Sequence, residues 1–335
     1  MSHNITNTNG KNEMAYVGEK PWHGLGQELQ RGASIETWLD AAGMGWKVQR
    51  AKVRYPVSVG AKSDAFREWP DQHVLFRSDT KAPLGMVSDR FKIVQPKQVL
   101  EFFRDLCATN KFSLETAGTL RGGSIYWALA KIHEEADVGA GDLVRGYVML
   151  STACDGSRRT VAKNTTVRVV CNNTLDMADT EKGRREVCVS HRSVFDAAEV
   201  KTDLGIAHDA FARFMVSARA LAARQLTRSD VDDLTLKLLG GDDWAEFTAD
   251  QRGAVLESKH AQAIATLYAG GRGAELDTAK GTAWGYVNAV TEYVDHYYPA
   301  RSLENRLNSA WFGYGERLKN HAMQKTLELV TERLS

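Results

Sequence analysis

The sequence has few cysteines, few prolines and no excess of charge of either sign. Its 335 residues contain four cysteines, spaced 47, 17 and 17 residues apart, and none of them forms a C-x-x-C pair. This spacing predicts reduced thiols and excludes both a zinc knuckle and a dense disulfide framework. The formal net charge of +1 excludes a protein that coats nucleic acid through its overall charge. Any nucleic-acid contact must therefore come from a local basic surface.

Long hydrophobic runs are also absent. No segment reaches the roughly eighteen uninterrupted apolar residues that a membrane-spanning helix needs. The N-terminus, MSHNITNTNGKNEM, is polar and lacks the apolar core of a signal peptide. We therefore expect a cytoplasmic protein without a membrane partner.

The familiar motifs of catalysis are missing as well. The chain has no G-x-x-x-x-G-K-[ST] phosphate loop, no G-x-G-x-x-G fingerprint, no H-E-x-x-H zinc helix and no G-x-S-x-G nucleophile elbow. These absences weigh against the usual NTPase, dehydrogenase, metalloprotease and hydrolase sites. The sequence accordingly predicts no cofactor, no metal and no catalytic residue, and favours a binding protein over an enzyme.

The patterns that are present divide the chain into three parts. Residues 1–15, rich in Asn, Thr, Ser and Gly, are expected to form a flexible arm. Residues 16–195 are expected to form an α+β domain, in which an antiparallel sheet is flanked by helices. Residues 196–335 show mainly amphipathic helical periodicity. The predicted fold class is therefore α+β, with an N-terminal antiparallel sheet followed by a mainly helical C-terminal region.

Particular elements follow from local signals. Ser34 is a candidate N-cap for a helix over residues 34–42, and Pro96 opens a second helix. The expected strands cover residues 46–59, 74–77, 84–87, 112–120, 125–132, 143–153 and 160–170. The expected C-terminal helices cover residues 196–225, 229–239, 250–269, 278–298 and 314–334.

Positive charge is concentrated near the middle of the chain. Residues 158–192 contain eight Lys and Arg against four Asp and Glu. Asp155-Gly156 lies between two expected strands and is typical of a tight turn. Basic side chains on such a hairpin can bind phosphates through charge-assisted hydrogen bonds, although a hairpin tip that is simply solvated explains the same pattern. The candidate nucleic-acid-binding residues are Arg158, Arg159, Lys163, Arg168, Asn172 and Asn173.

Three other features have weaker functional interpretations. The loop Pro21-Trp22-His23-Gly24-Leu25-Gly26 combines an aromatic ring, an imidazole and two glycines, and is suited to hold a ligand or a neighbouring subunit. Tyr126 and Trp127 offer rings for base stacking, but alternate strand positions face the core. A helix around Trp284 has an apolar stripe, with Glu292 and His296 at i,i+4 on its other side; two ligands do not complete a metal site.

Four segments together resemble the phage/plasmid-related family, a domain of unknown function found on phages, plasmids and integrative elements. They are residues 21–26, the strand pair over 117–131, the string Thr166-Val167-Arg168-Val169-Val170-Cys171-Asn172-Asn173-Thr174-Leu175, and residues 288–296. The resemblance implies a protein of mobile DNA. The predicted arrangement of sheet, helices and basic hairpin is also distantly similar to that of single-strand DNA annealing proteins, which is an analogy of fold.

This context favours a protein that binds and anneals single-stranded DNA as a homo-oligomer, either a ring or a filament. Annealing requires only that strands be held extended with their charge neutralised, so a basic groove suffices without catalysis. One alternative is a nuclease or nucleotide-modifying enzyme that uses His23, His191 or the Glu292/His296 pair with a metal ion. The other is an interaction protein that binds a host factor through the C-terminal helices, where residues 231–335 carry a net charge of −4.

Overall fold

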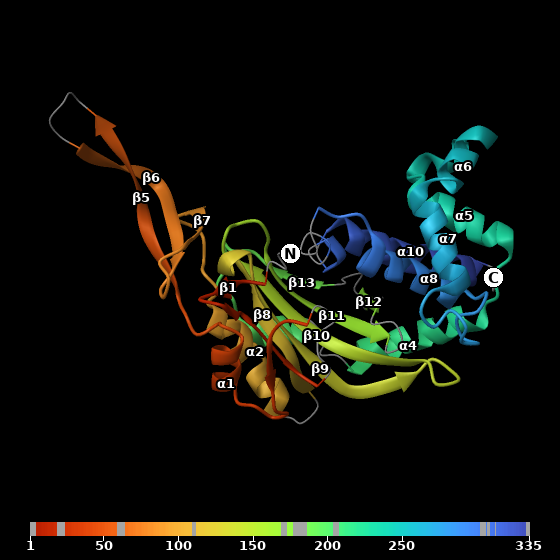
Figure 1. Ribbon diagram of the computed structural model, residues 1–335, viewed down its shortest axis with the longest axis horizontal. Helices are drawn as coiled ribbons and strands as arrows, with labels where there is room; N and C mark the ends of the chain where they lie inside the picture. The colour runs from red at the N-terminus through yellow and green to blue at the C-terminus, as the bar shows by residue number, and fades with distance from the viewer. Residues whose placement is uncertain are drawn as a thin grey trace. The chain divides into compact units, whose positions relative to one another are not determined.

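The chain has a mixed α+β fold in a computed structural model, with antiparallel sheets toward the N-terminus and mostly helices in the C-terminal part (Figure 1). The predicted fold class is therefore confirmed. The structure describes residues 5–18, 24–58, 64–108, 112–168, 173–176, 186–203, 208–301, 306, 309–311 and 313–332.

Residue contacts divide the chain into two compact units that interleave along the sequence. Unit 1 consists of Met1–His133, Val148–Lys163 and Glu186–Ile206. Unit 2 consists of Glu134–Tyr147, Asn164–Arg185 and Ala207–Ser335. The parts expected from the sequence, residues 1–15, 16–195 and 196–335, are by contrast continuous stretches of the chain.

The described strands form three sheets. They are β1 (Asn7–Thr8), β2 (Lys11–Asn12), β3 (Met14–Val17), β4 (Gln27–Leu29), β5 (Val48–Ser58), β6 (Asp64–Arg77), β7 (Pro83–Ser88), β8 (Phe112–Leu120), β9 (Ile125–Asp137), β10 (Leu143–Ala153), β11 (Thr160–Arg168), β12 (Asn173–Asp176) and β13 (Glu186–Val189). The largest sheet has the order β12-β11-β10-β9-β8-β3-β4, and β13 also pairs with β11. β1 pairs with β2, and β5, β6 and β7 form a separate antiparallel sheet. The β3–β4 pair is parallel, unlike the purely antiparallel sheet that was expected.

Helices account for most of the described residues after Ala197. They are α1 (Ile35–Ala41), α2 (Pro96–Ala108), α3 (Ala197–Asp203), α4 (His208–Ala223), α5 (Arg228–Leu239), α6 (Ala249–Leu256), α7 (Lys259–Gly270), α8 (Ala283–Glu292) and α10 (Tyr314–Glu332). Short turns of helix are η1 (Arg121–Gly123), η2 (Asp242–Glu246) and the π-helical η3 (Tyr293–Tyr297).

Two N-terminal helices begin as their sequence signals predicted. The Ser34 hydroxyl accepts a hydrogen bond from the Thr37 backbone N–H at 3.2 Å, which caps α1. α2 begins at Pro96, where a missing N–H costs nothing because the first turn has no partner for it. α2 buries Val99, Phe102 and other apolar side chains on one face, and this face belongs to the core of unit 1.

The core of unit 2 is built mainly around α8. Every residue of this helix is buried, including Asn288 and Glu292. The sequence places Glu292 on the side of this helix away from the apolar stripe, and that side is also covered, because α4, α7 and α10 all contact α8. The Glu292 carboxylate accepts a hydrogen bond from the Arg272 backbone N–H at 3.0 Å, and so is satisfied inside the protein.

The expected flexible arm is also corrected. Within residues 1–15, the structure describes residues 5–15, and these form β1, β2 and the start of β3, which pairs with β8. The Glu13 carboxylate explains this order, because it is buried and accepts hydrogen bonds from Arg77 and Thr119. A buried carboxylate with several donors anchors the segment that carries it.

Candidate nucleic-acid interface

The predicted turn exists, and it carries two of the predicted basic residues. The Asp155 carboxylate accepts a hydrogen bond from the Ser157 backbone N–H at 2.8 Å, and Gly156 has a φ of +77°, which favours glycine. Arg158 is half-buried and Arg159 is exposed. These two residues are therefore placed at a turn of unit 1, and their role in binding stays a prediction.

The two other predicted cations with described side chains lie inside the protein. Lys163 is only 2% exposed, and in the antiparallel register it lies directly opposite Glu186 of β13. Arg168 is 3% exposed. Neither side chain reaches an outer surface of the described chain. Asn172 lies outside the described residues, and Asn173 begins β12, with a side chain that is not described.

Arg168 belongs to a buried network centred on Asp142. Both oxygens of the Asp142 carboxylate accept hydrogen bonds from the Arg168 guanidinium, at 2.7 and 2.8 Å. The Thr278 hydroxyl and the Trp284 indole N–H also donate to this carboxylate, at 2.7 and 3.0 Å. Since Asp142 is 1% exposed, the arginine balances a buried charge within unit 2. This network gives Arg168 a structural task.

The remaining predicted features fall outside a binding surface or outside the described chain. Tyr126 and Trp127 are buried, and the Tyr126 hydroxyl donates to the Val94 carbonyl. His23 lies outside the described residues. In the described ranges, no group of three or more His, Cys, Asp and Glu side chains is arranged to hold a metal ion.

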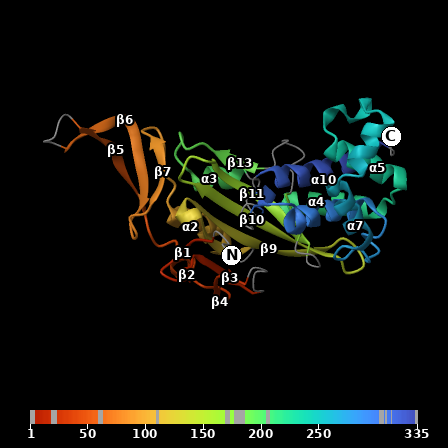
Figure 2. The same cartoon turned by 45° about the horizontal axis from the view of Figure 1, so that its top comes forward.

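An exposed surface that the sequence analysis did not select lies on the β5–β6 hairpin. β7 pairs with β6 only between Gln72 and Phe76, so the outer half of the hairpin is a two-stranded ribbon (Figure 2). We call residues 53–58 and 64–69 the outer ribbon. A two-stranded ribbon has no third strand along its edges, and alone it is marginally stable in water.

One face of the outer ribbon combines two aromatic rings and a cation. Tyr55 and Arg67 are directly opposite each other in the register, so their side chains share a face. The Trp69 ring joins this face, with its centroid 6.1 Å from that of Tyr55. Tyr55 is 41% exposed and Trp69 is 57% exposed. Arg67 is exposed and forms no ion pair within the described chain. We call Tyr55, Arg67 and Trp69 the aromatic face.

The opposite face has a different character. Phe66 lies opposite Pro56 and is 63% exposed. Beside them, the Glu68 carboxylate accepts hydrogen bonds from Lys52 and Arg54 at 2.8 and 2.9 Å, and these bonds lower the pKa of Glu68. The cations of this face are therefore paired, whereas Arg67 on the aromatic face has no ion pair with any side chain that the structure describes.

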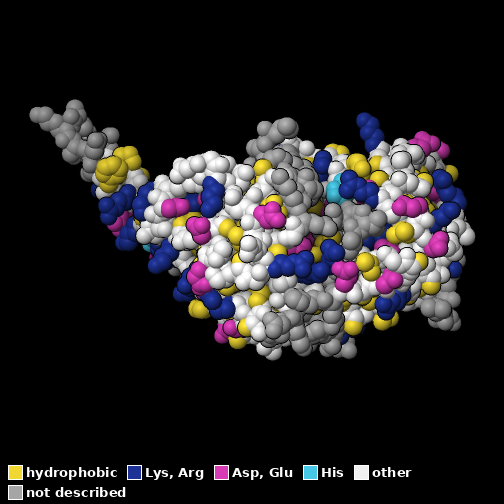
Figure 3. Space-filling model, turned by 60° about the horizontal axis from the view of Figure 1, so that its bottom comes forward, with side chains coloured by type: hydrophobic (Ala, Val, Ile, Leu, Met, Phe, Trp, Pro, Cys, Tyr) yellow, Lys and Arg dark blue, Asp and Glu magenta, His cyan; other side chains and the backbone are white. Residues whose placement is uncertain are grey.

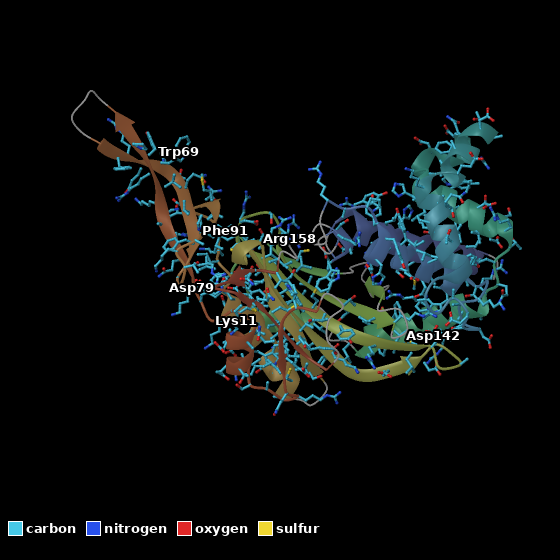
Figure 4. All side chains as sticks on the ribbon, in the orientation of Figure 1. Lys11, Trp69, Asp79, Phe91, Asp142 and Arg158 are labelled. Atoms are coloured by element: carbon cyan, nitrogen blue, oxygen red, sulfur yellow. The ribbon has the colours of Figure 1, made fainter. Side chains whose placement is uncertain are left out.

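The base of the hairpin lies against the turn that carries Arg158 and Arg159. A Cβ at Gly85 of β7 would lie 2.5 Å from the Asp155 Cα, so only glycine allows this close approach. The His191 ring then connects the two segments, since its nitrogens lie 3.1 Å from the Lys92 and Arg158 carbonyl oxygens. Figure 4 shows Phe91 and Arg158 near each other at the hairpin base.

Exposed cations extend from the aromatic face to this turn within unit 1. Figure 3 shows hydrophobic and basic side chains side by side on the segment formed by β5 and β6. Residues 48–77 contain six Lys and Arg against three Asp and Glu, although the chain as a whole is almost neutral. The exposed cations of these segments include Arg50, Arg67, Arg90, Lys92, Arg159 and Arg192, whereas the exposed Lys52 and Arg54 pair with Glu68.

Comparison with known families identifies the chain as a member of a family whose function is not described. Residues 83–311 match the family model described as a domain of unknown function (DUF932), so the chain belongs to that family. β5 and β6 precede this matched span, whereas the Asp155–Arg159 turn and Asp142 lie within it. Comparisons with curated proteins and with solved structures find no match. No helix in the described part of the chain has the length and apolar character of a membrane span.

Proposed function

We propose that this protein binds single-stranded DNA, with the β5–β6 hairpin and the Asp155–Arg159 turn as its contact surface. The aromatic face carries the proposal. Two exposed rings stand beside an exposed arginine that has no ion pair among the described side chains. This arrangement suits single-strand binding, in which bases stack on rings and cations contact phosphates. Arg159 and the half-buried Arg158 extend this surface as phosphate contacts.

The proposal includes strand annealing by a homo-oligomer, in the context of phages and plasmids and in the cytoplasm. Annealing needs two strands held extended with their bases accessible, and an exposed ribbon meets that need without a reacting group. An oligomer places several ribbons along one strand, which raises the effective concentration of binding surfaces. Light scattering of the protein with and without DNA tests the oligomeric state.

The first experiment measures fluorescence anisotropy of a labelled thymine oligonucleotide and of a duplex of equal length, over a series of salt concentrations. We expect tighter binding to the single strand, because duplex bases are already stacked on one another. Affinity should fall as salt rises, since phosphate contacts release counterions. Absence of binding at low salt would remove the proposal and would make the ribbon a surface for a protein partner.

Two matched variants test the surface itself. Trp69→Ala removes a ring from the aromatic face, and we expect it to weaken binding by about tenfold or more, because stacking of one base contributes roughly 1–3 kcal/mol. Phe66→Ala removes an equally exposed ring from the opposite face of the same ribbon, and it should leave the affinity within about twofold. Equal losses in both variants would contradict the assignment of the aromatic face.

A further inference from the structure

His191 occupies an unusual position at the base of the hairpin. Its Nδ1 lies 3.1 Å from the Lys92 carbonyl oxygen, and its Nε2 lies 3.1 Å from the Arg158 carbonyl oxygen. The Lys92 backbone N–H donates to the His191 carbonyl at 2.6 Å. The imidazole ring is stacked on Phe91, with centroids 4.2 Å apart and 16° between the planes. The side chain therefore contacts two separate segments through both ring nitrogens.

Only one protonation state satisfies both contacts. A carbonyl oxygen accepts hydrogen bonds and never donates them, so each ring nitrogen must carry a proton. Neutral imidazole has one N–H, and its second nitrogen would point a lone pair at a carbonyl oxygen. The imidazolium form has two N–H groups and makes two charge-assisted hydrogen bonds. Both contacts can therefore be hydrogen bonds at the same time only when His191 is protonated.

We propose that His191 is a positioning residue of the DNA-binding surface, and that its protonation clamps the Asp155–Arg159 turn to the segment of residues 89–95. This inference rests on the proposed function, because those two segments carry Arg158, Arg159 and Lys92. In the neutral form one of the two bonds is lost, so the turn and the segment separate more readily. The clamp is thus complete in the imidazolium form and incomplete in the neutral form.

The charges around the ring connect this equilibrium to DNA. The charged side chains on the contacting segments are Asp89, Arg90 and Lys92 before α2, Asp155, Arg158 and Arg159 in the turn, Arg192 beside His191, and Arg50, whose guanidinium donates to the Phe91 carbonyl at 2.6 Å. Asp89 pairs with His73 at 2.8 Å. Cations predominate, and they oppose a further positive charge on the ring. Bound phosphates relieve that repulsion, so DNA binding and proton uptake by His191 favour each other.

Two substitutions of His191 imitate its charged and its neutral form. His191→Arg supplies permanent charge and several N–H donors, and a guanidinium also stacks on an aromatic ring such as Phe91. His191→Gln removes the ionisable group. His260→Gln is the control, because His260 in unit 2 also stacks on a ring, that of Tyr298, but its Nδ1 contacts the Tyr293 hydroxyl in place of a carbonyl.

The clamp is measured first without DNA, as hydrogen-exchange protection of residues 89–95 and 155–159, corrected for the intrinsic exchange rate at each pH. Between pH 6 and pH 8 we expect protection to fall in the natural protein and in His260→Gln, to stay high in His191→Arg and to stay low in His191→Gln. Constant protection in the natural protein would overturn the clamp, whatever the protein does with DNA.

The second measurement is the affinity for the labelled thymine oligonucleotide at constant ionic strength. Linkage to one proton predicts that the natural protein binds more tightly at lower pH, by at most about tenfold per pH unit. His191→Arg should flatten this dependence. If protection changes with pH as expected but no variant binds DNA, the proposed function fails while the clamp stands. If DNA binds with the same pH dependence in His191→Arg and in the natural protein, the regulatory role is overturned.

Discussion

Arg168 and Arg67 both lie on strands and near a tryptophan, but Arg168 is buried and Arg67 is exposed. Arg168 is buried, with its guanidinium carbon 5.9 Å from the Trp284 ring centroid and its charge balanced by Asp142. Arg67 is exposed beside Trp69 and has no ion pair in the described chain. The difference shows that a basic residue on a strand becomes a binding residue only where the fold supplies no internal counter-charge.

The largest expected effect comes from making the same substitution at both arginines. Arg168→Gln leaves the Asp142 carboxylate buried without its partner charge, and we expect a loss of about 3–5 kcal/mol in the free energy of unfolding. Arg67→Gln is a surface change and should alter stability by no more than about 0.5 kcal/mol. Urea denaturation followed by circular dichroism measures both.

The same pair should show the reverse order in DNA binding. Arg67→Gln should weaken single-strand binding and reduce the slope of log affinity against log salt by about 0.7, the value for one phosphate contact on a single strand. Arg168→Gln, measured where it is still folded, should leave that slope unchanged. If both variants changed the slope equally, the contrast between the two arginines would not hold.

Glu13→Gln in unit 1 should lower the free energy of unfolding by an amount between those of Arg168→Gln and Arg67→Gln. The Glu13 carboxylate is buried and binds Arg77, which also lies 4.4 Å from the Trp46 ring centroid. Although burial acts to lower it, the hydrogen bonds that Arg77 donates to the Asp79 and Glu13 carboxylates raise its pKa above the ordinary value. Because Asp79 still pairs with Arg77 in the variant, we expect a smaller loss, about 1–3 kcal/mol, in the same denaturation experiment. A loss as large as that of Arg168→Gln would show that Asp79 contributes little.

Gly85→Ala tests the junction between the hairpin base and the turn. The new methyl group would lie 2.5 Å from the Asp155 Cα, so the turn must move. We expect a destabilisation of about 1–3 kcal/mol, together with faster hydrogen exchange at residues 155–159. Gly45→Ala is the matched control, since an added Cβ there has no neighbour within 4 Å. If Gly85→Ala and Gly45→Ala destabilised the protein equally, the loss of glycine's backbone freedom would be the cause, and not the contact with Asp155.

The smallest effect concerns thiol reactivity. Burial raises the pKa of Cys154 to about 12, whereas Cys188 is exposed. Since the thiolate is the reactive form, a mild alkylating agent at pH 8 should label Cys188 long before Cys154 in the folded protein. Mass spectrometry of peptides after short exposure measures the ratio. Equal labelling would show that β10 opens readily at its C-terminal end.

Local signals in the sequence predicted much of the fold. Ser34 and Pro96 gave the starts of α1 and α2, and the bounds of β8 and β10 agree with the expected strands. Such signals act within a few residues of the structure they specify. The expected helix over residues 250–269 was nevertheless too long, because α6 ends at Leu256 and Ser258 caps a new helix, α7. At such a position a capping residue starts a new helix even where the apolar periodicity continues.

The candidate site was predicted only in part, since it depends on distant partners. The Asp155-Gly156 turn was readable from its own residues, but the burial of Arg168 depends on Asp142 and Trp284, which lie 26 residues before and 116 residues after it. Residues 53–58 of the outer ribbon lie in the expected strand 46–59, but residues 64–69 were not expected as a strand because Pro70 interrupts the strand pattern. β6 accommodates this proline in a bulge, where the register shifts and Asp71 has a φ of +56°. The alternation Phe66-Arg67-Glu68-Trp69 was the available signal.

The Asp142 network also has a consequence for synthesis of the chain. The carboxylate binds Arg168, Thr278 and Trp284, and the last of these lies 142 residues further along the sequence. At ribosomal rates of about 5–20 residues per second, roughly 7–28 s separate the emergence of Asp142 from that of its last partner. Throughout that interval the nascent chain holds an acidic group that its own helices have yet to cover, so the Asp142 network is completed only after Trp284 has been synthesised.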